Sequence, residues 1–108
     1  MNLFHICYLL SQACLGEINV NFRRIYFSIK DNTIILYFIL EKYDEDDEET
    51  IEYEIVSEFS ILTENFLEAS GLDDNFIISK KIIISNEPEY YIKNHEEEYF
   101  EEFYRRKE

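Results

Sequence analysis

The first apolar segment of the chain repeats its hydrophobic residues at the spacing of an α-helix. The repeating positions are Leu3, Ile6, Cys7, Leu10 and Cys14. Gly16 follows them at the position where a glycine in the left-handed conformation commonly ends a helix. We therefore predict a first helix over residues 3–15 with one buried face.

Two runs rich in β-branched and aromatic residues come next, at residues 24–30 and 33–40. Such runs favour β-strands, and the dipeptide Asp31-Asn32 between them is typical of a tight turn. The second run is apolar at every position between Ile34 and Leu40, so both of its faces are expected to be covered. These residues predict a β-hairpin whose second strand is central in a sheet.

An acidic run over residues 44–49 opens the next element. The hydrophobic residues that follow are spaced by four, four, three and four positions: Ile51, Ile55, Phe59, Leu62 and Phe66. Asp44 is a suitable N-cap, and acidic residues in a first turn are favoured by the helix dipole. Residues 51–55 also alternate as a strand would, but the alternation breaks at Val56, and a length of about 15 residues suits a helix. We predict a second, amphipathic helix.

The last third of the chain contains a predicted third strand and an ambiguous ending. Residues 76–84 are rich in isoleucine and follow a break at Gly71. Within residues 96–106, Tyr99, Phe100, Phe103 and Tyr104 share one helical face, and Glu101–Arg105 and Glu102–Arg106 are favourable i,i+4 pairs. The local pattern favours a helix there, and a strand remains the alternative. The predicted fold is α+β, an antiparallel sheet of about four strands with the N-terminal helix and the second helix packed on it, in a single domain over residues 1–108.

The charge of the chain is large and regional. The 108 residues carry 24 acidic and 10 basic side chains, a net charge of -14, and residues 44–102 alone hold 20 acids and 3 bases. Nine Tyr and nine Phe argue against disorder. A nucleic acid backbone or an anionic membrane would repel this charge, so we expect neither as a partner. A basic protein would be attracted.

Candidate chemistry is sparse. His5 lies within an apolar run and His95 has no motif around it, so neither has an orienting partner that would make it a catalytic base. Cys7 and Cys14 lie two helical turns, about 10 Å, apart and are expected to be buried free thiols. The acidic run lacks the glycine of a calcium loop, and two glycines in the whole chain cannot form a phosphate-binding loop. We therefore expect no enzyme activity, no cofactor and no metal. The apolar run at the N-terminus is too short to span a bilayer, which predicts a cytoplasmic protein.

Several short blocks of the sequence resemble a known family. These blocks are Leu15-Gly16-Glu17-Ile18, Asn21-Phe22-Arg23, Asp46-Asp47-Glu48-Glu49, Glu54-Ile55-Val56-Ser57-Glu58-Phe59 and Tyr104-Arg105-Arg106-Lys107-Glu108. In this order they resemble small bacterial immunity proteins of contact-dependent growth inhibition and related polymorphic toxin systems. The resemblance implies a cytoplasmic α+β protein that binds and blocks the toxin domain of its own system, frequently a nuclease. Members of the family end in a strand, which is at odds with the helical pattern of the last segment.

Charge and resemblance together predict a protein that neutralises a basic toxin domain by steric and electrostatic occlusion, without turnover. Because specificity must distinguish one toxin from another, the contacts are expected outside the motif that the family shares, on exposed acids and tyrosines. The candidate toxin-binding residues are Asp44, Glu45, Asp46, Asp47, Glu48, Glu49 and Glu52, with Glu97, Glu98 and Glu101 as a second patch. Candidate anchors are Tyr43, Tyr53, Tyr90, Tyr91, Tyr99 and Tyr104.

Three alternatives compete with this interpretation. The acidic run can be an ordinary solvated helix face, although six consecutive acids repel one another and lower stability unless a basic partner relieves them. An acidic mimic of nucleic acid that inhibits a DNA-binding protein would present carboxylates in two rows at phosphate-like separation. A homo-oligomer would pair through its apolar hairpin edge; we expect a monomer.

Overall fold

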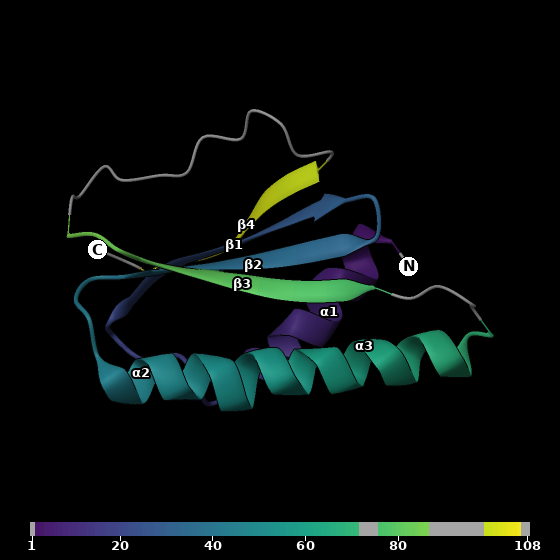
Figure 1. Cartoon of the computed structure of the whole chain (residues 1–108), viewed down its shortest axis with the longest axis horizontal. Coiled ribbons are helices and arrows are strands. Elements are labelled where there is room, and N and C mark those ends of the chain that lie inside the picture. The colour runs from purple at the N-terminus through teal and green to yellow at the C-terminus, as the bar shows by residue number, and fades with distance from the viewer. Residues whose placement is uncertain (1, 72–75, 87–98, 107–108) are drawn as a thin grey trace.

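The computed structural model describes residues 2–71, 76–86 and 99–106. Its elements are α1 (Leu3–Cys14), β1 (Phe22–Lys30), β2 (Thr33–Leu40), α2 (Glu45–Glu49), the π-helix η1 (Thr50–Val56), α3 (Ser57–Ala69), β3 (Ile77–Ile84) and β4 (Tyr99–Arg105). The four strands form one sheet in the order β3-β2-β1-β4. All the helices lie on one face of this sheet (Figure 1). The predicted α+β class is confirmed.

The first helix begins and ends where the sequence indicates. Asn2 caps it by accepting a hydrogen bond from the backbone N–H of His5 at 3.0 Å. Gly16 follows the C-cap with a φ of +80°, a left-handed conformation that glycine adopts without a steric penalty. The buried face consists of Ile6, Leu9, Leu10, Ala13 and Cys14, while Leu3 is 37% exposed.

The hairpin is also confirmed, and its strands occupy the two central positions of the sheet. β1 and β2 pair antiparallel from Phe22–Leu40 to Lys30–Thr33. Asp31 takes a φ of +55° in the two-residue turn, which aspartate tolerates better than most residues. Phe27, Leu36 and Phe38 are fully buried beneath the helices.

The third strand departs from the predicted antiparallel sheet. β3 pairs with β2 in parallel, from Thr33–Ile77 to Leu40–Ile84. The long helix between the two strands carries the chain back along the sheet, so β3 starts at the same end as β2 (Figure 1). The residue pattern of a strand does not distinguish parallel from antiparallel pairing, because side chains alternate between the two faces in the same way in either direction.

The ending is a strand, and the helical pattern of the last segment was misleading where the structure describes it. β4 pairs antiparallel with the outer edge of β1, with Phe100 opposite Ser28. The Phe100 ring stacks on Tyr26 at a centroid distance of 5.2 Å. In place of the expected Glu102–Arg106 pair, Glu102 binds Arg105 at 2.9 Å and Arg24 at 3.5 Å. Residues 96–98 lie outside the described part of the chain.

The predicted amphipathic helix is continuous over α2, η1 and α3, with a π-helix in its middle. Its buried residues recur every four positions: Asp47, Ile51, Ile55, Phe59, Thr63 and Leu67. In an α-helix a four-residue step turns by about 400°, so such a row would drift around the helix by about 40° per step. A π-helix has more residues per turn, so a row of residues spaced by four drifts around it in the opposite direction. The seven π-helical residues therefore keep this row facing the sheet.

Two apolar clusters hold the layers together. The larger one fills the space between the helices and the sheet, and the smaller one, around Tyr26, Tyr37 and Ile39, lies on the opposite face of the sheet. Cys14 belongs to the larger cluster, and burial together with the charge of Glu17 raises the pKa of its thiol to about 12. Cys14 therefore stays protonated at neutral pH. Both cysteines are free thiols, as predicted, although Cys7 is only partly buried.

Candidate functional site

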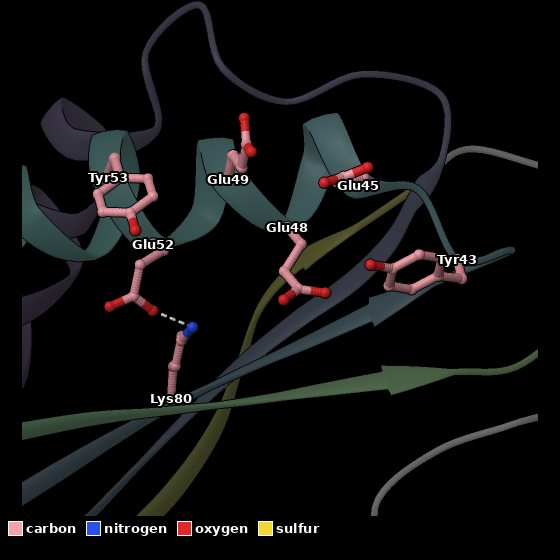
Figure 2. Close-up of a pocket in the computed structure, with 7 residues that line it drawn as sticks. All are labelled: Tyr43, Glu45, Glu48, Glu49, Glu52, Tyr53 and Lys80. Atoms are coloured by element: carbon pink, nitrogen blue, oxygen red, sulfur yellow. Dashed lines mark ion pairs between the residues drawn. The ribbon is translucent and has the colours of Figure 1, made fainter.

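An open pocket of about 360 Å³ lies between the beginning of the long helix and the edge strand β3. Its lining residues are Tyr43, Glu45, Glu48, Glu49, Glu52, Tyr53 and Lys80. We call this surface the acidic groove. Figure 2 shows its four glutamates along the helix, with Tyr43 at one end and Lys80 reaching up from the sheet.

The helix geometry explains why these carboxylates face outward together. Asp47, Ile51 and Ile55 point toward the sheet. The residues between them must then face solvent, and Glu48, Glu49 and Glu52 are exposed. Three exposed residues in a row, 52–54, separate Ile51 from Ile55.

Tyr43 and Tyr53 flank the carboxylates and remain accessible, with exposed fractions of 62% and 71%. The charge of Glu48 raises the pKa of Tyr43, aided by desolvation, by a hydrogen bond to Glu48 and by the charges of Glu45 and Asp44. The phenol therefore stays protonated and remains a hydrogen-bond donor. Large exposed aromatic side chains beside charges are the residues that most often dominate protein interfaces.

Lys80 is the only basic residue among the described residues that line the groove. Its ammonium forms an ion pair with the Glu52 carboxylate, shown as a dashed line in Figure 2. The groove thus presents four carboxylates against one ammonium. This arrangement suits the binding of cationic side chains.

Asp47, one of the predicted contact residues, is buried and has another role. Its two carboxylate oxygens accept hydrogen bonds from the side-chain amides of Asn19 at 2.7 Å and Asn21 at 2.8 Å. Asn21 also bonds to the backbone of Lys42 through both atoms of its amide. Asp44 caps the helix by accepting from the Asp47 N–H at 3.0 Å. Asp47 therefore joins the loop before β1 to the helix start, Asp44 caps the helix, and both carboxylates are engaged within the protein.

The remaining predicted contacts fall into separate places. Glu45, Glu48, Glu49 and Glu52 line the groove, and Asp46 is exposed beside it. Glu101 is exposed on β4, at the opposite edge of the sheet from the groove. Glu97 and Glu98 lie outside the described residues. The structure therefore places Glu101 apart from the first patch.

The sequence analysis missed Lys80 as part of this site. Only the pairing of β3 with β2 shows its place, because Lys80 lies in register with Leu36, a buried residue on the helix side of the sheet. Register with β2 was not available from the sequence, since the pairing direction was unknown. Tyr43 and Tyr53 were recognised as candidate anchors from their position among the acids.

Several residues of the blocks that suggested a family have internal partners, whereas Glu48 and Glu49 of the same blocks line the groove. Arg23, 3% exposed, donates from Nη1 to the Ser85 carbonyl at 2.8 Å. Asn21 holds the Asp47 carboxylate, and Ile55 and Phe59 are fully buried. These residues build the fold and leave the groove residues to face a partner.

Other candidate sites offer less. His5 stacks against Phe66 at a centroid distance of 4.4 Å, and its Nδ1 accepts from the Asn2 N–H, so it packs as a helix-cap residue. Within residues 2–71, 76–86 and 99–106, no cluster of three or more His, Cys, Asp or Glu side chains is placed to hold a metal ion. In the same ranges, no helix has the length and apolarity to cross a membrane. His95 lies outside these ranges.

Exposed carboxylates and phenols at the start of the long helix give this small α+β protein a charged surface of a kind that suits contact with another protein. Comparison with known families identifies it more closely. The model of the family described as MafI2 immunity protein matches residues 5–108, and the chain belongs to this family. The resemblance to immunity proteins of polymorphic toxin systems is thereby confirmed. No curated protein matches the chain. As an immunity protein, it has a cognate toxin as its partner.

Proposed function

We propose that the acidic groove is the surface through which this immunity protein binds a basic, nuclease-type toxin domain in the cytoplasm. The observation that carries the proposal is the groove itself, which four glutamates and two exposed tyrosines line at the start of the long helix. Nucleases present basic clefts to their anionic substrates, so a surface of this charge is complementary to them. The proposed setting is a contact-dependent growth inhibition or related toxin system.

The inhibition is stoichiometric in this proposal. Binding covers the substrate cleft or its rim and replaces the phosphates that the cleft would hold with glutamate carboxylates. Net charge speeds the encounter, because opposite charges steer diffusing proteins together. The tyrosines supply contact area that acids alone do not, since Tyr43 and Tyr53 expose more than half of their surface.

The experiment mixes the purified protein with the C-terminal toxin domain encoded beside it. Binding is followed by calorimetry, and nuclease activity is followed on RNA and DNA. We expect one-to-one binding with loss of nuclease activity. A toxin domain that acts on another substrate would contradict the nuclease assignment, and absence of binding would contradict the partner assignment.

A pair of matched variants tests the groove. Glu48→Lys/Glu49→Lys reverses two groove charges, and Glu64→Lys/Glu68→Lys reverses two exposed charges farther along the same helix. Both variants change the net charge equally. We expect the groove variant to slow association by about tenfold or more at low salt and the control to change it much less. Equal effects of the two variants would place the contact elsewhere.

A further inference from the structure

Two adjacent lysines in the middle of β3 have different surroundings. Lys80 points to the helix side of the sheet and lies in the acidic groove. Lys81 points to the opposite face, where its Nζ lies 5.7 Å from the centroid of the Tyr37 ring. The two residues carry the same charge on the same strand, and only Lys80 touches the groove.

The contact that Lys80 makes is one that a partner would also make. Its ammonium is paired with the Glu52 carboxylate, and the side chains are 27% and 45% exposed. The groove therefore already holds one cation supplied by its own chain. Glu45, Glu48 and Glu49 line the same groove with no other basic residue among its described lining residues.

We propose that Lys80 is an internal competitor that sets the specificity of the groove. A lysine or arginine side chain of the toxin displaces the Lys80 ammonium from Glu52 when the complex forms. This inference rests on the proposed function and adds the chemical class of the toxin group that enters the groove. A ligand with a single charge gains little by such an exchange, because one ion pair is lost for each one formed.

The consequence of competition is selectivity for a partner that offers more than charge. A toxin that also contacts Tyr43 and Tyr53 recovers the lost ion pair through those contacts. A basic protein of the wrong shape does not recover it. Lys80 thus raises the contact energy that a partner must supply, and a basic protein without further contacts in the groove binds it only weakly.

The test compares Lys80→Met with Lys81→Met in binding to the toxin domain. Methionine keeps the apolar stem of lysine and removes the charge. Both substitutions remove one positive charge, so the long-range electrostatic attraction to a basic toxin changes equally. We expect Lys80→Met to bind about twofold to fivefold more tightly than Lys81→Met, the range typical of one partly exposed ion pair.

A second comparison shows whether Glu52 is the residue that is released. In a Glu52→Gln background, Lys80→Met should lose most of its advantage, because there is no carboxylate to set free. Lys80→Gln serves as a second variant, since an added methionine on an edge strand can promote aggregation. Thermal unfolding of every variant checks that the fold is kept.

The outcomes separate the two proposals. If Glu48→Lys/Glu49→Lys weakens binding while Lys80→Met equals Lys81→Met or binds less tightly, the competitor role is overturned and the groove remains the contact. If the wild type does not bind the toxin domain, or groove reversals have no effect, the proposed function fails and the role of Lys80 fails with it.

Discussion

Neighbouring acids between residues 44 and 52 have opposite tasks, although they look alike in the sequence. Asp44 caps the helix, and Asp47 is buried and accepts two amide hydrogen bonds. Glu48 and Glu49 face outward into the groove. The sequence pattern predicted that this stretch is functional, and it predicted Asp44 as the cap. It did not separate Asp47 from the others, because the partners of Asp47 lie 26 and 28 residues away.

Replacing Asp47 by alanine tests this division at the level of one residue. The change removes the carboxylate that accepts hydrogen bonds from the Asn19 amide and from the buried Asn21 amide, and hydrogen bonds to a charged group are the stronger ones. We expect the free energy of unfolding to fall by about 2 kcal/mol, measured by urea denaturation. Asp46→Ala, at an exposed neighbour, should change it by less than about 0.5 kcal/mol. Equal effects of the two changes would show that the network contributes little.

At the scale of elements, the sequence predicted local structure better than pairing. The helices, the hairpin and the strand at 76–84 follow from spacing and turn residues, which are local properties. The parallel direction of β3 depends on where the long helix returns the chain. The strand conformation of β4 depends on the edge of β1 that it pairs with. The backbone hydrogen bonds to that edge outweigh the i,i+4 side-chain pairs that favour a helix in isolation.

The π-helix also escaped the sequence analysis, although its cause was visible there. Ile51, Ile55 and Phe59 are spaced by four, a period between those of an α-helix and a π-helix. The alternation over residues 51–55 that suggested a strand comes from the same spacing. The π-helix lets all three residues stay buried against one sheet over this part of the row.

Deleting Glu54 tests this explanation at the level of the element. The buried row would then be spaced by four, three and four around the deletion, which an ordinary α-helix accommodates. We expect the protein to fold without the π-helix, with stability within about 1 kcal/mol of the wild type, because only an exposed residue is lost. A crystal structure and urea denaturation of the variant measure both points. Glu54→Gln, which keeps the length, should retain the π-helix, and an unfolded deletion variant would contradict the explanation.

At the scale of the whole molecule, charge is distributed unevenly. Residues 44–102 carry most of the acids, and the remaining segments hold 4 acids and 7 bases. Part of the basic set is used internally, since Arg106 donates to the Val20 carbonyl at 2.7 Å and to Glu41 at 3.3 Å. The sequence predicted the sign and region of this charge, because both depend on composition alone. It could not predict which acids share a groove, because that depends on the fold.

Salt dependence of toxin association tests the role of this charge. Raising the salt concentration from about 0.1 M to about 1 M shortens the screening length from about 10 Å to about 3 Å. We expect the association rate measured by stopped flow to fall by at least tenfold, while dissociation changes less. The Glu48→Lys/Glu49→Lys variant should show a flatter dependence. A rate that salt does not alter would mean that steering has no part in the encounter.

The row of buried side chains at every fourth position of the long helix has a consequence for how relatives of this protein can diverge. On the long helix, the positions that hold the sheet and the positions that line the groove are different residues. Substitutions at 45, 48, 49, 52 and 53 can therefore accumulate without disturbing the hydrophobic core. Related chains can therefore adapt to a toxin whose sequence changes by substituting exposed residues alone, so that the binding specificity changes while the fold is kept.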